Sequence, residues 1–364
     1  MWEVSYESVS SLPIGTTLRA VSFAVKQLGY HPCRRSPFFS PEDCLPYCWF
    51  DSNDYRSFAG VYLHVEHTES GTVVYTRTNE GRSYYDRQHQ NATIRTLRRL
   101  FGGSFVTDFG RNRYFPDDGC PEEPDQAGCH LAFQRFGRSV LRADWYLQTR
   151  TFPGAEQREL YKLVPDQDPR LLSCHLLLPY LVAVFEAYLR DTFVALLRYS
   201  SAKEKVLKGA RLSAKHLREI SEGATSVEDA FAQTLSFQNV TAAAESLSLI
   251  DKRIDLLAQF RKPFRRRKRN LVETLEEMIA RRHAFVHRSE FGFDLDEQMV
   301  WRLLDDLEFS VDRFYRHLTK LRGWAYDKGW GRPTGSQRRL HLPPNATSDR
   351  ANDAGRDAGI PNTR

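Results

Sequence analysis

The feature that most constrains this fold is a helical repeat of apolar residues near the end of the chain. The repeat consists of Val300, Leu304, Leu307, Val311, Phe314, Leu318 and Leu321. Steps of four and three place these side chains along one stripe of an α-helix. Because such a stripe is stable only when another element covers it, the sequence predicts a set of packed helices here.

Apolar residues recur at helical spacing throughout residues 165–328. This pattern predicts an all-α bundle. Two prolines and two acids, in VPDQDP at 164–169, are typical of the entry into a long helix. Residues 329–364 are rich in Gly, Pro, Asn, Asp and Arg, and they predict a disordered tail. The other expected helices span residues 171–197, 212–222, 227–237, 240–260 and 264–287.

The sequence predicts an α+β domain over residues 1–164, but it does not define the role of this domain, for which sensing and substrate recognition are the candidates. β-branched and aromatic runs at 58–66 and 71–78 flank a turn, which indicates a hairpin. A helix is expected at 91–101, where two glycines end it. The fold class is therefore an α+β domain followed by an all-α bundle. Further strands are expected at 104–109, 130–136 and 142–151.

Composition narrows the class of protein. Hydrophobic residues make up 41% of the chain and charged residues 27%, which is typical of a soluble globular protein. The most apolar run, at 176–185, is shorter than the roughly 18 residues of a membrane span. The N-terminus lacks the pattern of a signal peptide. Six cysteines in so long a chain favour a reducing cytoplasm over a disulfide framework.

An Arg and a His lie close together at the end of the helix expected at 264–287. Arg282 continues the apolar stripe of Leu271, Leu275 and Met278, so it occupies a position where an apolar side chain is expected. A permanent cation there is costly unless something uses it. His287 can move a proton near neutral pH. Together the two side chains indicate chemistry on a phosphodiester.

The spacing of this pair is not by itself decisive. Other Arg and His residues in the chain have similar spacings, and the structural alternative is a snorkelling Arg with a His at a helix C-terminus. Five residues on an ideal helix also put His287 about 7.5 Å beyond Arg282 and on another face. Both side chains reach one site only if the helix end bends or a second subunit completes the cleft.

Three sequence segments resemble the HEPN superfamily, close to the RiboL-PSP-HEPN groups. The segment 275–292, LEEMIARRHAFVHRSEFG, is similar to the family signature of an Arg, four to six residues and a His. FEAYLRD at 185–191 resembles the first-helix pattern, and SFQN at 236–239 resembles the start of a middle helix. A long amphipathic helix follows the His, as in the family. The resemblance covers roughly residues 170–325.

The resemblance implies an all-α bundle that forms a homodimer, with two Arg/His pairs lining one cleft. Many members are metal-independent endoribonucleases of phage-defence or toxin–antitoxin systems, so RNA and a protein trigger or antitoxin are the expected partners, with no cofactor and no metal. His287 would transfer the proton and Arg282 would hold the phosphate. Arg281 also fits the family spacing, and His283 stands where many members have Asn, so both are supporting candidates.

Glu186 lies beside the apolar stripe of the helix expected at 171–197. HEPN proteins often carry a first-helix acid that faces the cleft, so the resemblance implies that Glu186 orients Arg282 or His287. The alternative is an ordinary helix-edge carboxylate paired with Arg190, four residues later.

The densest charge cluster in the chain, RKPFRRRKR at 261–269, immediately precedes the Arg282 helix. Like charges repel one another unless an anion lies nearby, so the run predicts contacts to RNA phosphates. The alternative is a solvated loop. The candidate RNA-binding residues are Arg265, Arg266, Arg267, Lys268 and Arg269.

The cysteines raise a weaker alternative, a zinc site. Cys44 and Cys48 have three residues between them, and these residue types are zinc ligands, although their spacing matches no common zinc module. Further ligand candidates are His31, Cys33, Cys120, Cys129 and His130. Three functions thus remain open: an endoribonuclease, a non-catalytic HEPN module that binds RNA or nucleotide or serves as a dimerisation scaffold, and a zinc-stabilised nucleic-acid-binding protein.

Overall fold

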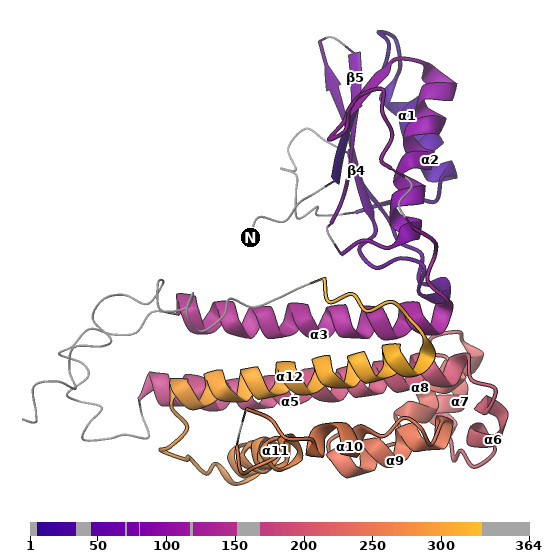
Figure 1. Cartoon of the computed structure of the whole chain (residues 1–364). Helices are drawn as coiled ribbons and strands as arrows, with labels where there is room; N and C mark the ends of the chain where they lie inside the picture. Colours follow the sequence, from indigo (N-terminus) through magenta and orange to yellow (C-terminus); the bar gives the residue numbers. More distant parts are fainter. Residues whose placement is uncertain are drawn as a thin grey trace, which may run out of the picture.

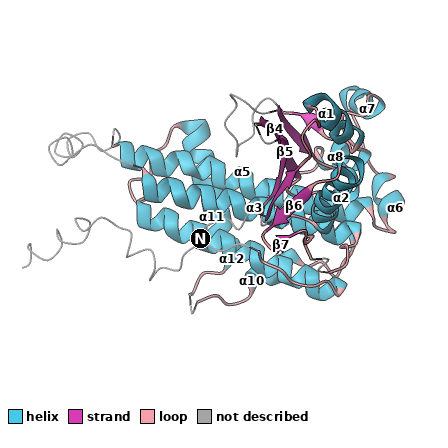
Figure 2. Cartoon of the chain, turned by 90° about the horizontal axis from the view of Figure 1, so that it is seen from above, coloured by secondary structure: helices cyan, strands magenta, loops and turns pink. Residues whose placement is uncertain are grey.

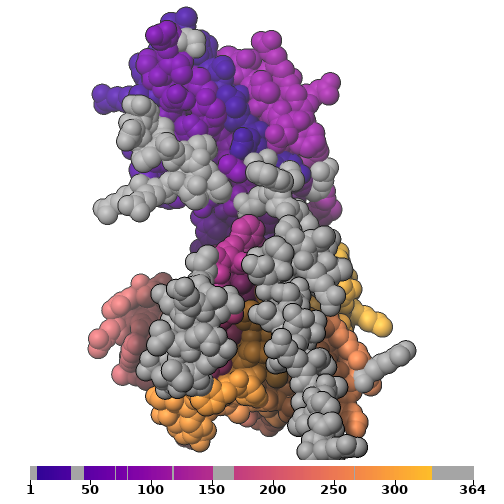
Figure 3. All heavy atoms as spheres, turned by 90° about the vertical axis from the view of Figure 1, so that its left-hand side faces the viewer, coloured from indigo at the N-terminus to yellow at the C-terminus, as the bar shows by residue number. Residues whose placement is uncertain are grey.

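The computed structural model describes residues 6–33, 45–69, 71–79, 81–116, 119–150, 168–265 and 267–329. An antiparallel sheet with two helices forms the N-terminal part, and a set of long helices forms the rest (Figure 1). In the space-filling view along the helices, the N-terminal part stands above the helical part, and magenta atoms of residues 124–149 lie between them (Figure 3). The α+β region followed by a helical region was predicted. The boundary at 164/165 and the tail from 330 onward fall outside the described residues.

The sheet has seven strands in the order β2-β3-β4-β5-β1-β6-β7, and every neighbouring pair is antiparallel. Its centre is the β4–β5 hairpin, which confirms the hairpin predicted from the aromatic and β-branched runs. β6 confirms the strand expected at 104–109. The strands are β1 Tyr6–Ser11, β2 His31–Pro32, β3 Leu45–Trp49, β4 Val61–Thr68, β5 Gly71–Thr78, β6 Ser104–Thr107 and β7 Gly110–Arg111.

Two helices, α1 (Leu18–Gln27) and α2 (Tyr84–Phe101), cover one face of the sheet (Figures 1 and 2). Alternate residues of β4 point to this face and meet apolar residues of both helices in a buried cluster. α2 begins seven residues before the predicted start because Ser83 and Asp86 form a capping box there. It ends at Gly102 with φ 78°, as the two glycines predicted.

The strands expected at 130–136 and 142–151 are wrong. Residues 130–136 and 142–149 belong to one helix, α3 (Pro124–Thr149), and residue 151 lies outside the described residues. All eight residues from 127 to 134 are buried, so the exposed face that gives an amphipathic helix its period is missing. α3 packs in the same core as the later helices. The helical core therefore begins before residue 165, where we expected the all-α bundle to start.

The helical part surrounds α5 (Pro169–Arg198), which runs beside α3 and α12 (Glu297–Arg322) (Figure 1). α5 confirms the helix expected at 171–197. Among the described helices it alone is long and apolar enough to cross a membrane, and half of its most apolar window is buried inside this core. Six of the seven stripe residues of α12 are buried and Leu321 is partly buried. The shorter helices are α6 Lys203–Leu207, α7 Ala214–Ser221, α8 Val227–Ala232, α9 Val240–Ile250, α10 Leu256–Arg261 and α11 Leu271–Arg288.

The single helix expected at 240–260 is wrong, because α9 and α10 are separate. The carboxylate of Asp251, which caps the end of α9, accepts hydrogen bonds from the backbone N–H and the guanidinium of Arg253. Asp255 then caps the start of α10. These local bonds compete with helical ones and end α9.

The N-terminal part meets the helical part at a short 3₁₀ turn, η1 (Asn53–Tyr55). Gly128 of α3 makes this contact close, since a Cβ there would lie 2.6 Å from Ala195 and 2.7 Å from the ring of Tyr55. The hydroxyl of Tyr199 donates a 2.7 Å hydrogen bond to Asp54. α3 is therefore packed between η1 on one side and α5 on the other.

Candidate functional site

The C-terminal half of α11 carries the candidate site. A capping box between Asn270 and Glu273 starts the helix. The first three stripe residues, Leu271, Leu275 and Met278, are buried in the helical core. Beyond them the helix emerges toward solvent, because its remaining turns contain charged and imidazole side chains. The core therefore holds the first half of α11 and presents the second half at the surface.

Arg282 lies where α11 leaves the core and is half-buried. Its Nε is buried and has no hydrogen-bond partner among the described residues. Its Nη1 lies 3.4 Å from Nδ1 of His283, and within the described part of the chain it makes no ion pair. An incompletely satisfied guanidinium at the rim of a core is suited to hold an anion.

His283 and His287 lie on the same exposed side of α11, one turn apart. Their rings are stacked with centroids 5.5 Å apart and planes inclined by 22°. His283 also contacts Arg282, so it lies between the two residues that the motif singled out. α11 remains helical to Arg288, and Ser289 caps it with a left-handed backbone. The two histidines and Arg282 therefore form a continuous row without a bend of the helix.

Arg281 has a different role from Arg282. Its guanidinium bonds to Glu277 at 2.9 Å and to Asp294 at 2.6 Å. These two carboxylates raise the pKa of the Arg281 guanidinium, chiefly through the hydrogen bonds that Arg281 donates to Asp294. Arg281 thus ties the loop after α11 to the helix, and its charge is already neutralised. Of the two arginines with the expected spacing, Arg282 is the one left to meet a ligand.

Glu186 belongs to α5 and lies close enough to Arg282 of α11 for their charges to interact. Burial raises the pKa of its carboxyl, while the charge of Arg282 and a hydrogen bond with Gln238 act in the opposite direction. Its Oε1 is buried without a hydrogen-bond partner among the described residues. Because Gln238 belongs to the SFQN segment, the fold brings together three of the segments on which the resemblance depends.

The basic run is largely paired with acids of neighbouring helices. Arg265 lies 3.5 Å from Asp305, Arg267 lies 2.6 Å from Asp306, and Arg269 bonds to Glu277. Lys268 is exposed and has no ion pair within the described residues, while Arg266 falls outside them. The run therefore presents less positive charge than its composition predicts.

Replacing Arg267 with alanine is expected to lower the free energy of unfolding by about 1–3 kcal/mol. Asp306 is 2% exposed, and burial raises the pKa of its carboxyl while Arg267 lowers it. Removal of the guanidinium leaves that buried carboxyl unpaired. Lys268→Ala is the matched control and should change stability by less than about 0.5 kcal/mol. Urea unfolding measures both variants, and equal stability would show that the Arg267 pair is not structural.

Of the candidate zinc ligands in the described residues, three lie at the β2–β3 pair and the others lie elsewhere. His31 pairs with Cys48 across β2–β3, and Cys33 follows β2, where burial, followed by Cys48, raises the pKa of the Cys33 thiol. Cys129 is buried in α3, and His130 bonds to Glu122. No group of three side chains in the described part of the chain is arranged to hold a metal ion, and Cys44 falls outside it.

Comparison with protein-family models, with curated proteins and with solved structures found no match to this chain.

Proposed function

We propose that this protein is a metal-independent endoribonuclease of the HEPN type. The observation that carries the proposal is the row of Arg282, His283 and His287 at the exposed end of α11, with a guanidinium that lacks an ion pair among the described residues. Cleavage of a phosphodiester by an internal nucleophile requires a cation that stabilises the charged transition state and groups that accept and donate a proton. The guanidinium supplies the cation, and the two imidazoles supply the proton-transfer groups.

RNA carries its own nucleophile, the 2′-hydroxyl beside each phosphate. His287 removes the proton from this hydroxyl, and the oxygen attacks phosphorus. The P–O5′ bond breaks, and the departing 5′-oxygen takes up a proton from the protonated imidazole of His283 or of a second copy's His287. Arg282 binds a phosphate oxygen and offsets the charge of the transition state. The products are a 2′,3′-cyclic phosphate and a 5′-hydroxyl.

We infer that residues around this row hold its side chains in position. Glu186 contributes a carboxylate on the side of the core, and its electrostatic interaction with Arg282 supports a role in holding the guanidinium. Arg281 keeps the loop after α11 in place through Asp294. Lys268 and the exposed parts of Arg265 and Arg269 supply contacts to the RNA backbone, fewer than the sequence predicted because acids already pair with both arginines.

A second copy of the chain is part of this proposal. Large apolar side chains are exposed on α11, in the loop after it and in the first turns of α5: Val286, Phe293, Leu172 and Leu176. His175 joins α5 to this loop by accepting a 3.0 Å hydrogen bond from the Gly292 N–H. Exposed apolar patches often mark protein interfaces, so they support a homodimer that completes the cleft. Such an enzyme would act in the cytoplasm in phage defence or as a toxin, with a protein trigger or antitoxin.

The test is to incubate the purified full-length protein with total RNA in the presence of EDTA. We expect cleavage that EDTA does not inhibit, with cyclic-phosphate ends detected by their resistance to ligation. Arg282→Ala should lower the rate by about 10²-fold or more, because it removes the charge that stabilises the transition state. Arg218→Ala, an exposed arginine on α7, is the control. Cleavage that requires a divalent metal, or that Arg282→Ala leaves unchanged, would contradict the proposal.

A further inference from the structure

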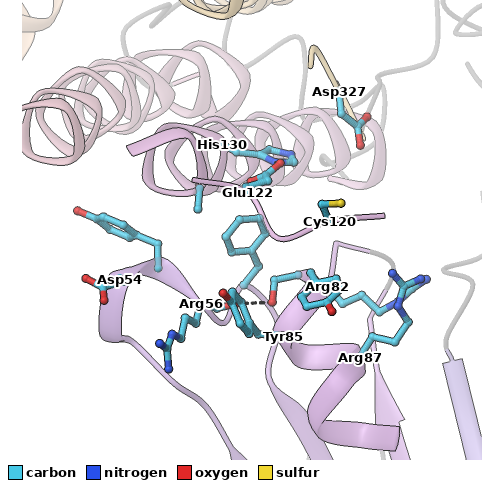
Figure 4. Close-up of a pocket in the computed structure, with 14 residues that line it drawn as sticks. Asp54, Arg56, Arg82, Tyr85, Arg87, Cys120, Glu122, His130 and Asp327 are labelled. Carbon is cyan, nitrogen blue, oxygen red and sulfur yellow. Dashed lines mark hydrogen bonds and ion pairs between the residues drawn. The ribbon is translucent and has the colours of Figure 1, made fainter. Parts of the chain in front are cut away.

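A pocket of about 220 Å³ lies where the N-terminal part meets α3, far along the chain from the α11 row. Residues of η1 and the start of α2 form one wall, and the segment before α3 and its first turns form the other (Figure 4). The volume is below the roughly 300–1,000 Å³ of pockets for drug-sized ligands. The enclosed volume therefore accommodates no more than one nucleotide.

The wall from the N-terminal part is basic and aromatic. Arg56, Arg82 and Arg87 line it, together with Tyr84 and Tyr85. Arg82 and Arg87 extend to the same end of the pocket in Figure 4, and Arg56 lies 5.3 Å from the ring of Tyr85. Arginines bind a phosphate through charge-assisted hydrogen bonds, and tyrosines bind an aromatic ring by stacking. A wall with both residue types can therefore bind a ligand that has a phosphate and a ring.

The opposite wall offers a hydrogen-bond acceptor. The side-chain amide of Gln134 donates to Nε2 of His130, so Nδ1 of His130 carries the proton and donates to Oε1 of Glu122 at 2.8 Å. The other oxygen, Oε2, is buried and has no partner among the described residues. Buried carboxylate oxygens without partners are rare in folded proteins, and a ligand hydroxyl or amino group would satisfy this one.

We propose that this pocket binds a mononucleotide. Its phosphate lies at the end toward which Arg82 and Arg87 extend, its base stacks on Tyr85, and a hydroxyl or amino group donates to Glu122. A free phosphate would leave the ring and the acceptor unused. Three carboxylates, of Asp54, Glu122 and Asp327, also line the pocket, so a nucleoside monophosphate is preferred over the more negatively charged triphosphate.

Calorimetric titration of the full-length protein tests this assignment with AMP, GMP, CMP and UMP as probes. At least one monophosphate should bind saturably at one site per chain. Its nucleoside, its triphosphate and inorganic phosphate should each bind at least about 10-fold more weakly, since each lacks a required group or adds charge. Absence of binding by all four monophosphates overturns the proposal, and so does inorganic phosphate that binds as tightly as the best of them.

Two pairs of variants place the ligand in this pocket. Tyr85→Leu should weaken binding by about 10-fold because it removes the ring, whereas Tyr85→Phe should keep it. Arg82→Gln should weaken binding of the monophosphate but not of its nucleoside, and Arg99→Gln, an exposed arginine at the far end of α2, is the matched control. If Arg82→Gln fails to fold, the Tyr85 pair decides. Monophosphate binding that Tyr85→Leu and a folded Arg82→Gln leave unchanged overturns the assignment.

Discussion

Replacing His287 with alanine is expected to lower the rate of RNA cleavage by roughly 10²–10⁴-fold, the usual contribution of a positioned acid or base. His287 is exposed near the end of α11, so its removal should leave the fold intact. Initial rates on a defined RNA, with the melting temperature of each variant, provide the measurement.

Two further variants make this result specific. His317→Ala removes a histidine of α12 whose Nε2 lies 3.2 Å from the carbonyl oxygen of Arg253, and it should retain full activity. His283→Ala should lower the rate less than His287→Ala, because His283 lies between Arg282 and His287 and acts on the leaving group or on orientation. If His283→Ala abolishes cleavage and His287→Ala does not, His283 is the base and the assignment of His287 is wrong.

Replacing Asp86 with alanine is expected to be the most destabilising single change in the N-terminal part. The carboxylate is completely buried and accepts hydrogen bonds from the backbone N–H groups of Phe58, Ala59, Gly60 and Ser83, at 2.8–3.1 Å, and from the hydroxyl of Ser57. The variant leaves these donors buried and unsatisfied. We expect a loss of about 3–5 kcal/mol in the free energy of unfolding.

Asp108→Ala is the matched control for Asp86. Its carboxylate also accepts a hydrogen bond from a backbone N–H, that of Glu7, but it is exposed to solvent. Its loss should therefore cost less than about 1 kcal/mol. Urea unfolding followed by circular dichroism gives both values. A loss below about 1 kcal/mol for Asp86→Ala as well would mean that the loop at 57–60 rearranges to satisfy its own donors.

The sequence predicted best those elements whose apolar residues follow a local pattern. The α12 stripe is visible because the helix has one buried and one exposed face, and the β4–β5 hairpin because its strands are β-branched and aromatic runs on either side of a turn. The first turns of α3 were missed because residues 127–134 are buried on every side, so their composition resembles that of a strand. The tertiary fold determines which elements pack against a segment. The local sequence of that segment therefore does not predict its burial.

The candidate site shows the same limit. The position of Arg282 at the rim of the core followed from the stripe of α11. The acids that pair with the basic run did not, because Asp305 and Asp306 lie on another helix about forty residues later in the chain. The pocket beside α3 was also missed, since its arginines, its tyrosines and Glu122 come from three separate segments.

The placement of α3 has a consequence for how the molecule unfolds. This helix is the shared wall between the sheet region and the helical core, with Gly128 in contact with Tyr55 on one side and Ala195 on the other. Loss of either region exposes apolar surface of α3 to water. The sheet region and the helical core have separate apolar clusters, and we expect this contact to couple their unfolding.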